Sequence, residues 1–84
     1  MSEKISDLPN IGKVLEEKLN AVGIKDVSTL KTVGSVEAFK KIQCQVDSGA
    51  CDCTLFALEG AIQGIRWHEL DKEYRNILVK KARG

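Results

Sequence analysis

The 84-residue sequence has little of several residue types that mark particular protein classes, with one proline, one histidine, three cysteines and 5% aromatic residues. Its formal net charge is only +1, whereas domains whose whole surface binds nucleic acid usually carry a clear basic excess. A chain this short buries about 60–65% of its unfolded surface, which is enough for one compact core. The two-domain architecture of most cofactor enzymes is therefore excluded, and residues 1–84 are expected to form a single domain.

Signals for export and membrane insertion are also missing. The N-terminal residues lack the apolar core that a signal peptide needs, and no apolar run approaches the ~20 residues that span a bilayer. A secreted domain of this size usually has an even set of four or more cysteines, whereas the number here is odd. The sequence predicts a cytoplasmic protein with reduced thiols and no membrane partner.

What the sequence does contain is a recurring helix ending. Residues 19–23 and 30–34 both read Leu-x-x-Val-Gly, and a glycine there can take the left-handed conformation that closes a helix. We expect three consecutive helices joined by short turns, with Ser35 as the N-cap of the third. Residues 47–50, Asp-Ser-Gly-Ala, predict a loop at the midpoint of the domain.

Apolar residues at helical spacing place two further helices in the second half of the chain. The fourth is expected to run from Asp52 or Thr54 to about Gly64, and the fifth to start after Asp71 with Tyr74, Ile77 and Leu78 facing inward. No segment alternates with a period of two, so no sheet is expected. The predicted fold class is all-α, a compact bundle of about five helices of the helix-hairpin-helix or SAM-like type.

The most specific stretch is residues 8–13, Leu-Pro-Asn-Ile-Gly-Lys. It resembles the hairpin of helix-hairpin-helix domains, in which a tight turn leaves backbone N–H groups free at a helix N-terminus to bind a phosphate. Candidate contacts to a DNA backbone are Asn10, Ile11, Gly12 and Lys13. Asn10 stands where that family prefers glycine, although asparagine tolerates a positive φ. The alternative is that this turn only connects two helices.

Charge is unevenly distributed along the chain. Residues 1–43 carry a net charge of +1, residues 44–71 carry −4, and residues 72–84 carry +4. The last segment predicts a secondary basic surface made of Lys72, Arg75, Lys80, Lys81 and Arg83. The alternative is that these side chains only complement the dipole at the end of the last helix.

The predicted fourth helix is unusual because small residues, including Gly60 and Gly64, recur at i, i+4 spacing. An interior glycine costs roughly 1 kcal/mol relative to alanine, so this spacing predicts either a close approach of another helix or a groove for a ligand. Glu59 is expected to pair with Arg66 or to contact a partner. Trp67 is expected to be a packing anchor rather than a platform for base stacking. Candidate residues for a protein partner are Glu59, Gly60, Gly64 and Trp67.

The cysteines and the histidine form no recognised reactive pattern. A zinc site would need Cys44, Cys51, Cys53 and His68 together, but the spacing lacks the usual Cys-x2-Cys pairs. Cys44 is expected on an apolar helix face as a small hydrophobic residue. A disulfide between Cys51 and Cys53 would be strained and is not expected in the cytoplasm. No nucleophile is placed beside His68. The sequence therefore predicts no metal, no cofactor and no enzymatic activity.

Four stretches carry a family resemblance: residues 8–12, 19–24, 33–38 and 55–70. The last is the longest and reads Leu-Phe-Ala-Leu-Glu-Gly-Ala-Ile-Gln-Gly, followed by Trp67, Glu69 and Leu70. On these stretches the chain resembles the C-terminal domain of the TfoX/Sxy family of bacterial competence regulators. The resemblance implies an all-helical fold and a role in transcriptional control of DNA uptake beside a cyclic-AMP-responsive activator. Longer family members carry an N-terminal domain, so this chain is expected to correspond to the C-terminal domain alone.

Two functions remain open from the sequence. The first is a non-enzymatic binding module that contacts the DNA backbone weakly through residues 10–13, in partnership with a transcription activator protein. The second is a protein–protein interaction adaptor without direct DNA binding, whose exposed face is the predicted fourth helix or the turn at residues 67–70. An enzyme is not supported, because the sequence has no paired-acid site, nucleotide-binding loop or poised nucleophile.

Overall fold

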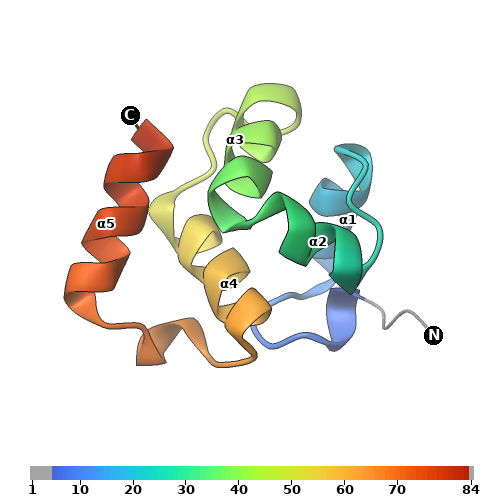
Figure 1. Ribbon diagram of the computed structural model, residues 1–84. Coiled ribbons are helices and arrows are strands. Elements are labelled where there is room, and N and C mark those ends of the chain that lie inside the picture. The colour runs from blue at the N-terminus through green and yellow to red at the C-terminus, as the bar shows by residue number, and fades with distance from the viewer. Residues whose placement is uncertain (1–4, 84) are drawn as a thin grey trace.

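Five α-helices and two short 3₁₀ turns form the fold in a computed structural model that describes residues 5–83 (Figure 1). In chain order they are η1 (Ile5–Asp7), α1 (Lys13–Ala21), α2 (Val27–Val33), α3 (Ser35–Gln45), α4 (Asp52–Gln63), η2 (Trp67–Glu69) and α5 (Lys72–Arg83). No strand occurs in this part of the chain. The expected all-α fold of about five helices is confirmed, and its helix-hairpin-helix or SAM-like type stays a prediction.

Helix α4 is the central element of the bundle. It lies between α5 on one side and α2 and α3 on the other, and it contacts all three (Figure 1). Leu55, Leu58 and Ala61 recur at i, i+3 and i+6 on one face and are fully buried. Three helices and the turn η2 pack around α4. The position of α4 therefore determines where the residues just before and just after this helix lie.

The predicted glycine ending of α1 is confirmed. Gly23 has a φ of +86°, in the left-handed region. The Ile24 N–H donates to the Leu19 carbonyl at 2.9 Å, and the Gly23 N–H donates to the Asn20 carbonyl at 3.0 Å. These two bonds are those of a Schellman motif, which satisfies carbonyl groups that the end of a helix would otherwise leave unpaired.

The predicted N-cap of α3 is wrong. Gly34 is the N-cap, with a φ of +87°, and Ser35 is the first residue of the helix. Ser35 has only 4% of its surface exposed, and its hydroxyl donates to Glu59 Oε1 at 2.6 Å. The serine therefore joins α3 to α4 instead of capping its own helix.

The inward face predicted for α5 is partly wrong. Leu78 is buried, and Tyr74 turns its hydroxyl toward α4 although 38% of the residue is exposed, whereas Ile77 is 48% exposed. Helix α5 contacts the core instead through Leu78, Val79 and Ala82.

Two further observations concern Cys44 and the character of the helices. Cys44 was expected on an apolar face, but it is exposed near the end of α3. None of the helices between residues 5 and 83 combines the length and apolar character that crossing a bilayer requires.

Candidate functional site

The turn before α1 is held in place by the side chain of Asn10. The backbone of Asn10 has a φ of +70°, so the expectation that asparagine tolerates this conformation is confirmed. Its Nδ2 donates to the Ile65 carbonyl at 2.9 Å, and its Oδ1 accepts from the Trp67 N–H at 3.2 Å. Asn10 thus ties the turn to the segment between α4 and η2, more than fifty residues away along the chain.

Helix α1 starts without a side-chain cap. Its N-cap is Gly12, and a Cβ placed there would meet nothing within 4 Å. The Glu16 N–H is the first to bond within the helix, to the Gly12 carbonyl at 3.0 Å. The N–H groups of the first turn before it point out of the helix end. Lys13 is exposed in this turn, so an ammonium group and unbonded N–H groups lie together.

A groove of about 450 Å³ adjoins the start of α1. Its lining comes from the first turns of α1 and α4 and from the 3₁₀ turn η2: Gly12, Lys13, Val14, Leu15, Lys18, Cys53, Thr54, Ala57 and Trp67. Two lysines of α1 line it. Lys18 forms an ion pair with Asp47 at 2.8 Å, whereas Lys13 has no carboxylate partner among residues 5–83. Lys13 is therefore the ammonium group that this groove offers to an anion.

Gly60 makes room for the turn before α1 and for the segment that follows α4, and not for a neighbouring α-helix. A Cβ at Gly60 would lie 2.5 Å from Asn10 Nδ2, 2.8 Å from the Ile65 carbonyl oxygen and 3.1 Å from Trp67 Cα. Gly64 has a different role, since it ends α4 in the left-handed conformation and has open space around it. The expectation that the two glycines together admit another helix is wrong.

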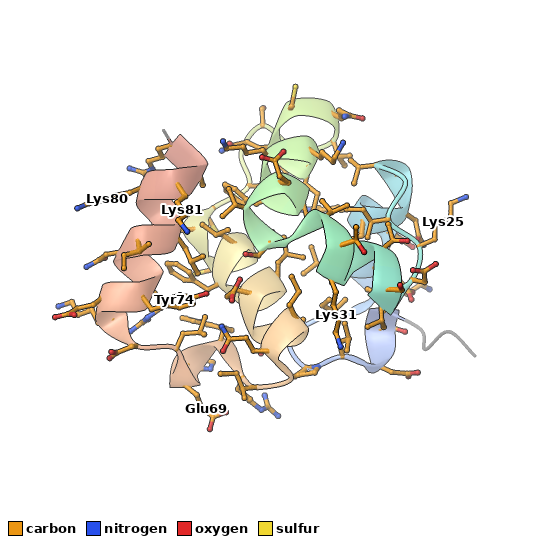
Figure 2. The ribbon with its side chains drawn as sticks, viewed as in Figure 1. Lys25, Lys31, Glu69, Tyr74, Lys80 and Lys81 are labelled. Atoms are coloured by element: carbon orange, nitrogen blue, oxygen red, sulfur yellow. The ribbon has the colours of Figure 1, made fainter. Side chains whose placement is uncertain are left out.

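Glu59 is the meeting point of three helices. Its carboxylate accepts hydrogen bonds from Ser35 Oγ at 2.6 Å, from Tyr74 Oη at 2.7 Å, and from Gln63 Nε2. These contacts join α3, α4 and α5. The expected pairing with Arg66 is wrong, because the carboxylate points toward α3 and α5. Figure 2 shows Tyr74 on the side of α5 that faces α4.

The ionisation of Glu59 depends on these contacts. Partial burial opposes ionisation, but the hydrogen bonds from Ser35, Gln63 and Tyr74, with the nearby charge of Lys81, hold the pKa of the Glu59 carboxyl below its usual value. The same contact acts in reverse on Tyr74, since its bond to Glu59 raises the pKa of the phenol. Glu59 is thus a partly buried charged group that links three helices, which is a reason for its presence in an otherwise apolar helix.

We expect Glu59→Gln to lower the free energy of unfolding by about 1–2 kcal/mol at neutral pH, because hydrogen bonds to a charged group are lost. The folded pKa lies below the unfolded value near 4.5, so ionised Glu59 stabilises the fold above that value. The contribution disappears as the pH falls through the folded pKa. Urea unfolding of both proteins should therefore show a difference that shrinks below pH 4.5.

The matched control for this prediction is Glu37→Gln, since Glu37 is exposed in the first turn of α3. The same loss of charge there should change stability little. A stability difference at Glu59 that does not vary with pH would show that its hydrogen-bonded carboxylate is not the source.

Trp67 packs against aromatic and basic side chains from neighbouring elements. Its ring stacks on Phe56 with the centroids 5.8 Å apart and the planes at 28°. The Arg75 guanidinium lies 5.8 Å from the Phe56 centroid and 5.9 Å from the Trp67 centroid, which is within the range of a cation–π contact. Trp67 thus has the packing role that the sequence predicts.

The five basic side chains expected to form one surface on α5 point in different directions and have different contacts. Arg75 covers the two aromatic rings, and Arg83 forms an ion pair with Asp52 at 3.3 Å. Lys80 points away from the molecule, whereas Lys81 lies on the inner side of α5, where its charge reaches Glu59 (Figure 2). Lys72 is exposed at the other end of the helix. Lys72 and Lys80 are therefore the members most available to an outside anion.

The cysteines are free and exposed at the ends of α3 and α4. Within residues 5–83, no group of three or more histidine, cysteine, aspartate or glutamate side chains is arranged to hold a metal ion.

A family comparison covers almost the whole chain, because residues 1–82 match the TfoX C-terminal domain. The chain belongs to the TfoX C-terminal domain family. The resemblance seen in the sequence is thereby confirmed. This TfoX C-terminal domain is 43% identical over 80 residues to Protein Sxy of Escherichia coli K12, and 26% identical over 81 residues to DNA transformation protein TfoX1 of Aliivibrio fischeri.

The matched region is nearly all of this chain but only part of those relatives. It covers 95% and 96% of the present TfoX C-terminal domain, yet 38% and 39% of the two relatives. Two crystal structures of Listeria monocytogenes proteins of unknown function share the fold. They have TM-scores of 0.88 and 0.87 at 54% and 53% identity, and the match covers 93% and 94% of this chain and 88% and 95% of theirs.

Proposed function

We propose that this TfoX C-terminal domain is a non-enzymatic binding module of a transcription and competence regulator, and that the start of α1 contacts the DNA backbone. The observation that carries the proposal is the uncapped first turn of α1, where outward N–H groups lie beside the Lys13 ammonium. A helix N-terminus with these groups attracts phosphate through its dipole and its unbonded donors. The relationship to DNA transformation protein TfoX1 supports the regulatory setting.

The four candidate contact residues differ in how exposed they are and in what they bond to, and this supports different roles for them. The Asn10 side chain is bonded to the segment after α4, and Ile11 has only 5% of its surface exposed. They position the turn, while Gly12 and Lys13 face outward at the helix start. One phosphate contact of this kind gives weak binding without base readout, because phosphates carry no sequence information.

The test is a titration of the domain with short duplex DNA at two salt concentrations. Binding should weaken with salt, and Lys13→Glu should lower the slope of log affinity against log salt by about one, the amount expected for one phosphate contact. The control Lys25→Glu makes the same charge change beyond the other end of α1, where Lys25 is exposed (Figure 2). Equal effects of the two substitutions would contradict a contact at the start of α1.

The alternative is an adaptor that binds a protein, such as a transcription activator, without direct DNA contact. The favouring observation is Val14, which is 67% exposed at the groove beside α1, because a large exposed apolar residue is a common feature of protein-binding surfaces. Of the partner residues predicted from sequence, Glu59, Gly60 and Trp67 have internal contacts and Gly64 is exposed. No DNA binding even at low salt would favour this alternative.

A further inference from the structure

Two cysteines share the first turn of the central helix. Cys51 is the N-cap of α4, with extended φ and ψ of −95° and 170°, and Cys53 follows two residues later. Both are exposed free thiols. Two residues of chain span at most about 7 Å, close to the upper limit of the Cα separation across a disulfide, and the turn into the helix shortens this span. The chain therefore keeps the two Cα atoms within the range that a disulfide can span.

The two thiols have opposite electrostatic surroundings. The sulfur of Cys51 lies beside the N–H groups of Cys53 and Thr54 at the positive end of α4, without a well-aligned capping bond, and these groups lower the pKa of Cys51. Partial burial and the neighbouring charges of Cys51 and Asp52 raise the pKa of Cys53. The Cys51 thiol is therefore the more acidic of the two, and Cys53 is the one that holds its proton more firmly.

Asp52 stands between the two cysteines, and its negative charge would oppose a thiolate. Its carboxylate is in an ion pair with Arg83 at 3.3 Å, which partly offsets that charge.

Cys44 is a third cysteine whose surroundings differ from those of Cys51. It is also exposed, but it lies in the last turn of α3, where a helix end presents carbonyl groups instead of N–H groups.

We propose that Cys51 and Cys53 form a redox-sensitive dithiol, in which Cys51 reacts with a hydroperoxide and Cys53 closes an intramolecular disulfide. In the first step the Cys51 thiolate attacks the peroxide O–O bond, takes one oxygen as sulfenic acid and releases an alkoxide or hydroxide. In the second step Cys53 attacks the sulfenic sulfur. The hydroxyl group leaves with the Cys53 proton as water, and the S–S bond forms.

The resulting ring is small, so the disulfide is strained. Strained and exposed disulfides have more oxidising potentials and are the readily reversed ones. Small thiols should reopen it by thiol–disulfide exchange, which makes the pair suited to sensing peroxide and not to stapling the fold. The site and its chemistry are independent of whether the domain binds DNA.

The test uses the whole chain with one equivalent of hydrogen peroxide, followed by mass spectrometry. The wild type should lose two hydrogen atoms in mass and recover them after dithiothreitol, and peptide mapping should place the bond between Cys51 and Cys53. Cys53→Ser should leave Cys51 as a sulfenic acid that dimedone traps. Cys44→Ser should still form the disulfide, and Cys51→Ser should not form it.

A second measurement compares alkylation rates by iodoacetamide at pH 7. Cys51 should react several-fold faster than Cys44, because the helix N–H groups favour its thiolate and the gain is only partly offset by weaker nucleophilicity. Equal rates at Cys51 and Cys44, or loss of the disulfide in Cys44→Ser, would overturn the proposal. So would a product that forms only between two chains, seen as a dimer on a non-reducing gel.

Discussion

Replacing Asn10 with alanine is expected to lower the free energy of unfolding by about 2–3 kcal/mol. Two costs add together. The Ile65 carbonyl and the Trp67 N–H each lose a hydrogen bond, and alanine has no side chain to offset the strain at a φ of +70°. Urea unfolding followed by far-ultraviolet circular dichroism measures the loss, and an unchanged m-value would show that the unfolded state is not altered.

Asn10→Gly separates the two costs. Glycine removes both side-chain hydrogen bonds but takes a positive φ without strain, so we expect it to cost about 1 kcal/mol less than alanine. If both variants are as stable as the wild type, the side chain of Asn10 does not hold the turn. If alanine and glycine are equally harmful, the hydrogen bonds account for the whole effect and the backbone conformation for none.

Gly60→Ala is expected to lower the free energy of unfolding by about 2 kcal/mol, even though alanine is the better helix former by about 1 kcal/mol. The added Cβ would lie 2.8 Å from the Ile65 carbonyl oxygen and 3.1 Å from Trp67 Cα, both of which are backbone atoms. It would also lie 2.5 Å from Asn10 Nδ2 and push that side chain from its hydrogen bonds. Thermal or urea unfolding gives the measurement.

Gly49→Ala is the matched control, because a Cβ there makes only an ordinary contact of 3.5 Å with Asp47 Oδ1. It should change stability by no more than a few tenths of a kcal/mol. A double-mutant cycle adds a sharper test. In the Asn10→Gly background the clash with Nδ2 is absent, so Gly60→Ala should cost about 1 kcal/mol less than in the wild type. Additive effects would contradict the contact between these two positions.

Much of the secondary structure could be read from local sequence. Gly23 ends α1 in the left-handed conformation, as its position after an apolar helical stretch indicates. The predicted end of the fourth helix near Gly64 also agrees with the end of α4. The buried stripe of α4, including Leu55 and Leu58, follows from helical spacing alone. These features depend on backbone conformation and on the period of the helix, and both are properties of a few neighbouring residues.

The candidate sites could be predicted only in part. The motif at residues 8–13 indicated an open helix start, and the position of Lys13 there agrees with it. The inward role of Asn10 was missed, although asparagine in place of the expected glycine was a signal that its side chain had a task. The pairing of Glu59 was also missed, because Ser35 and Tyr74 lie 24 and 15 residues away along the chain.

By itself, the amino-acid sequence determined an all-helical domain, the glycine ending of α1 and the family, because local glycines, apolar spacing and the block at residues 55–70 carry that information. The tertiary structure alone decided what the polar and small residues do. Asn10 bonds to residues 55 and 57 positions away, and Glu59 bonds to Ser35 and Tyr74 at 24 and 15 positions. Gly60 leaves room for the distant Asn10 side chain, so these roles depend on how α4 packs against its neighbours. No local pattern specifies which distant group meets a partly buried amide or carboxylate, or which group fills the space that a glycine leaves.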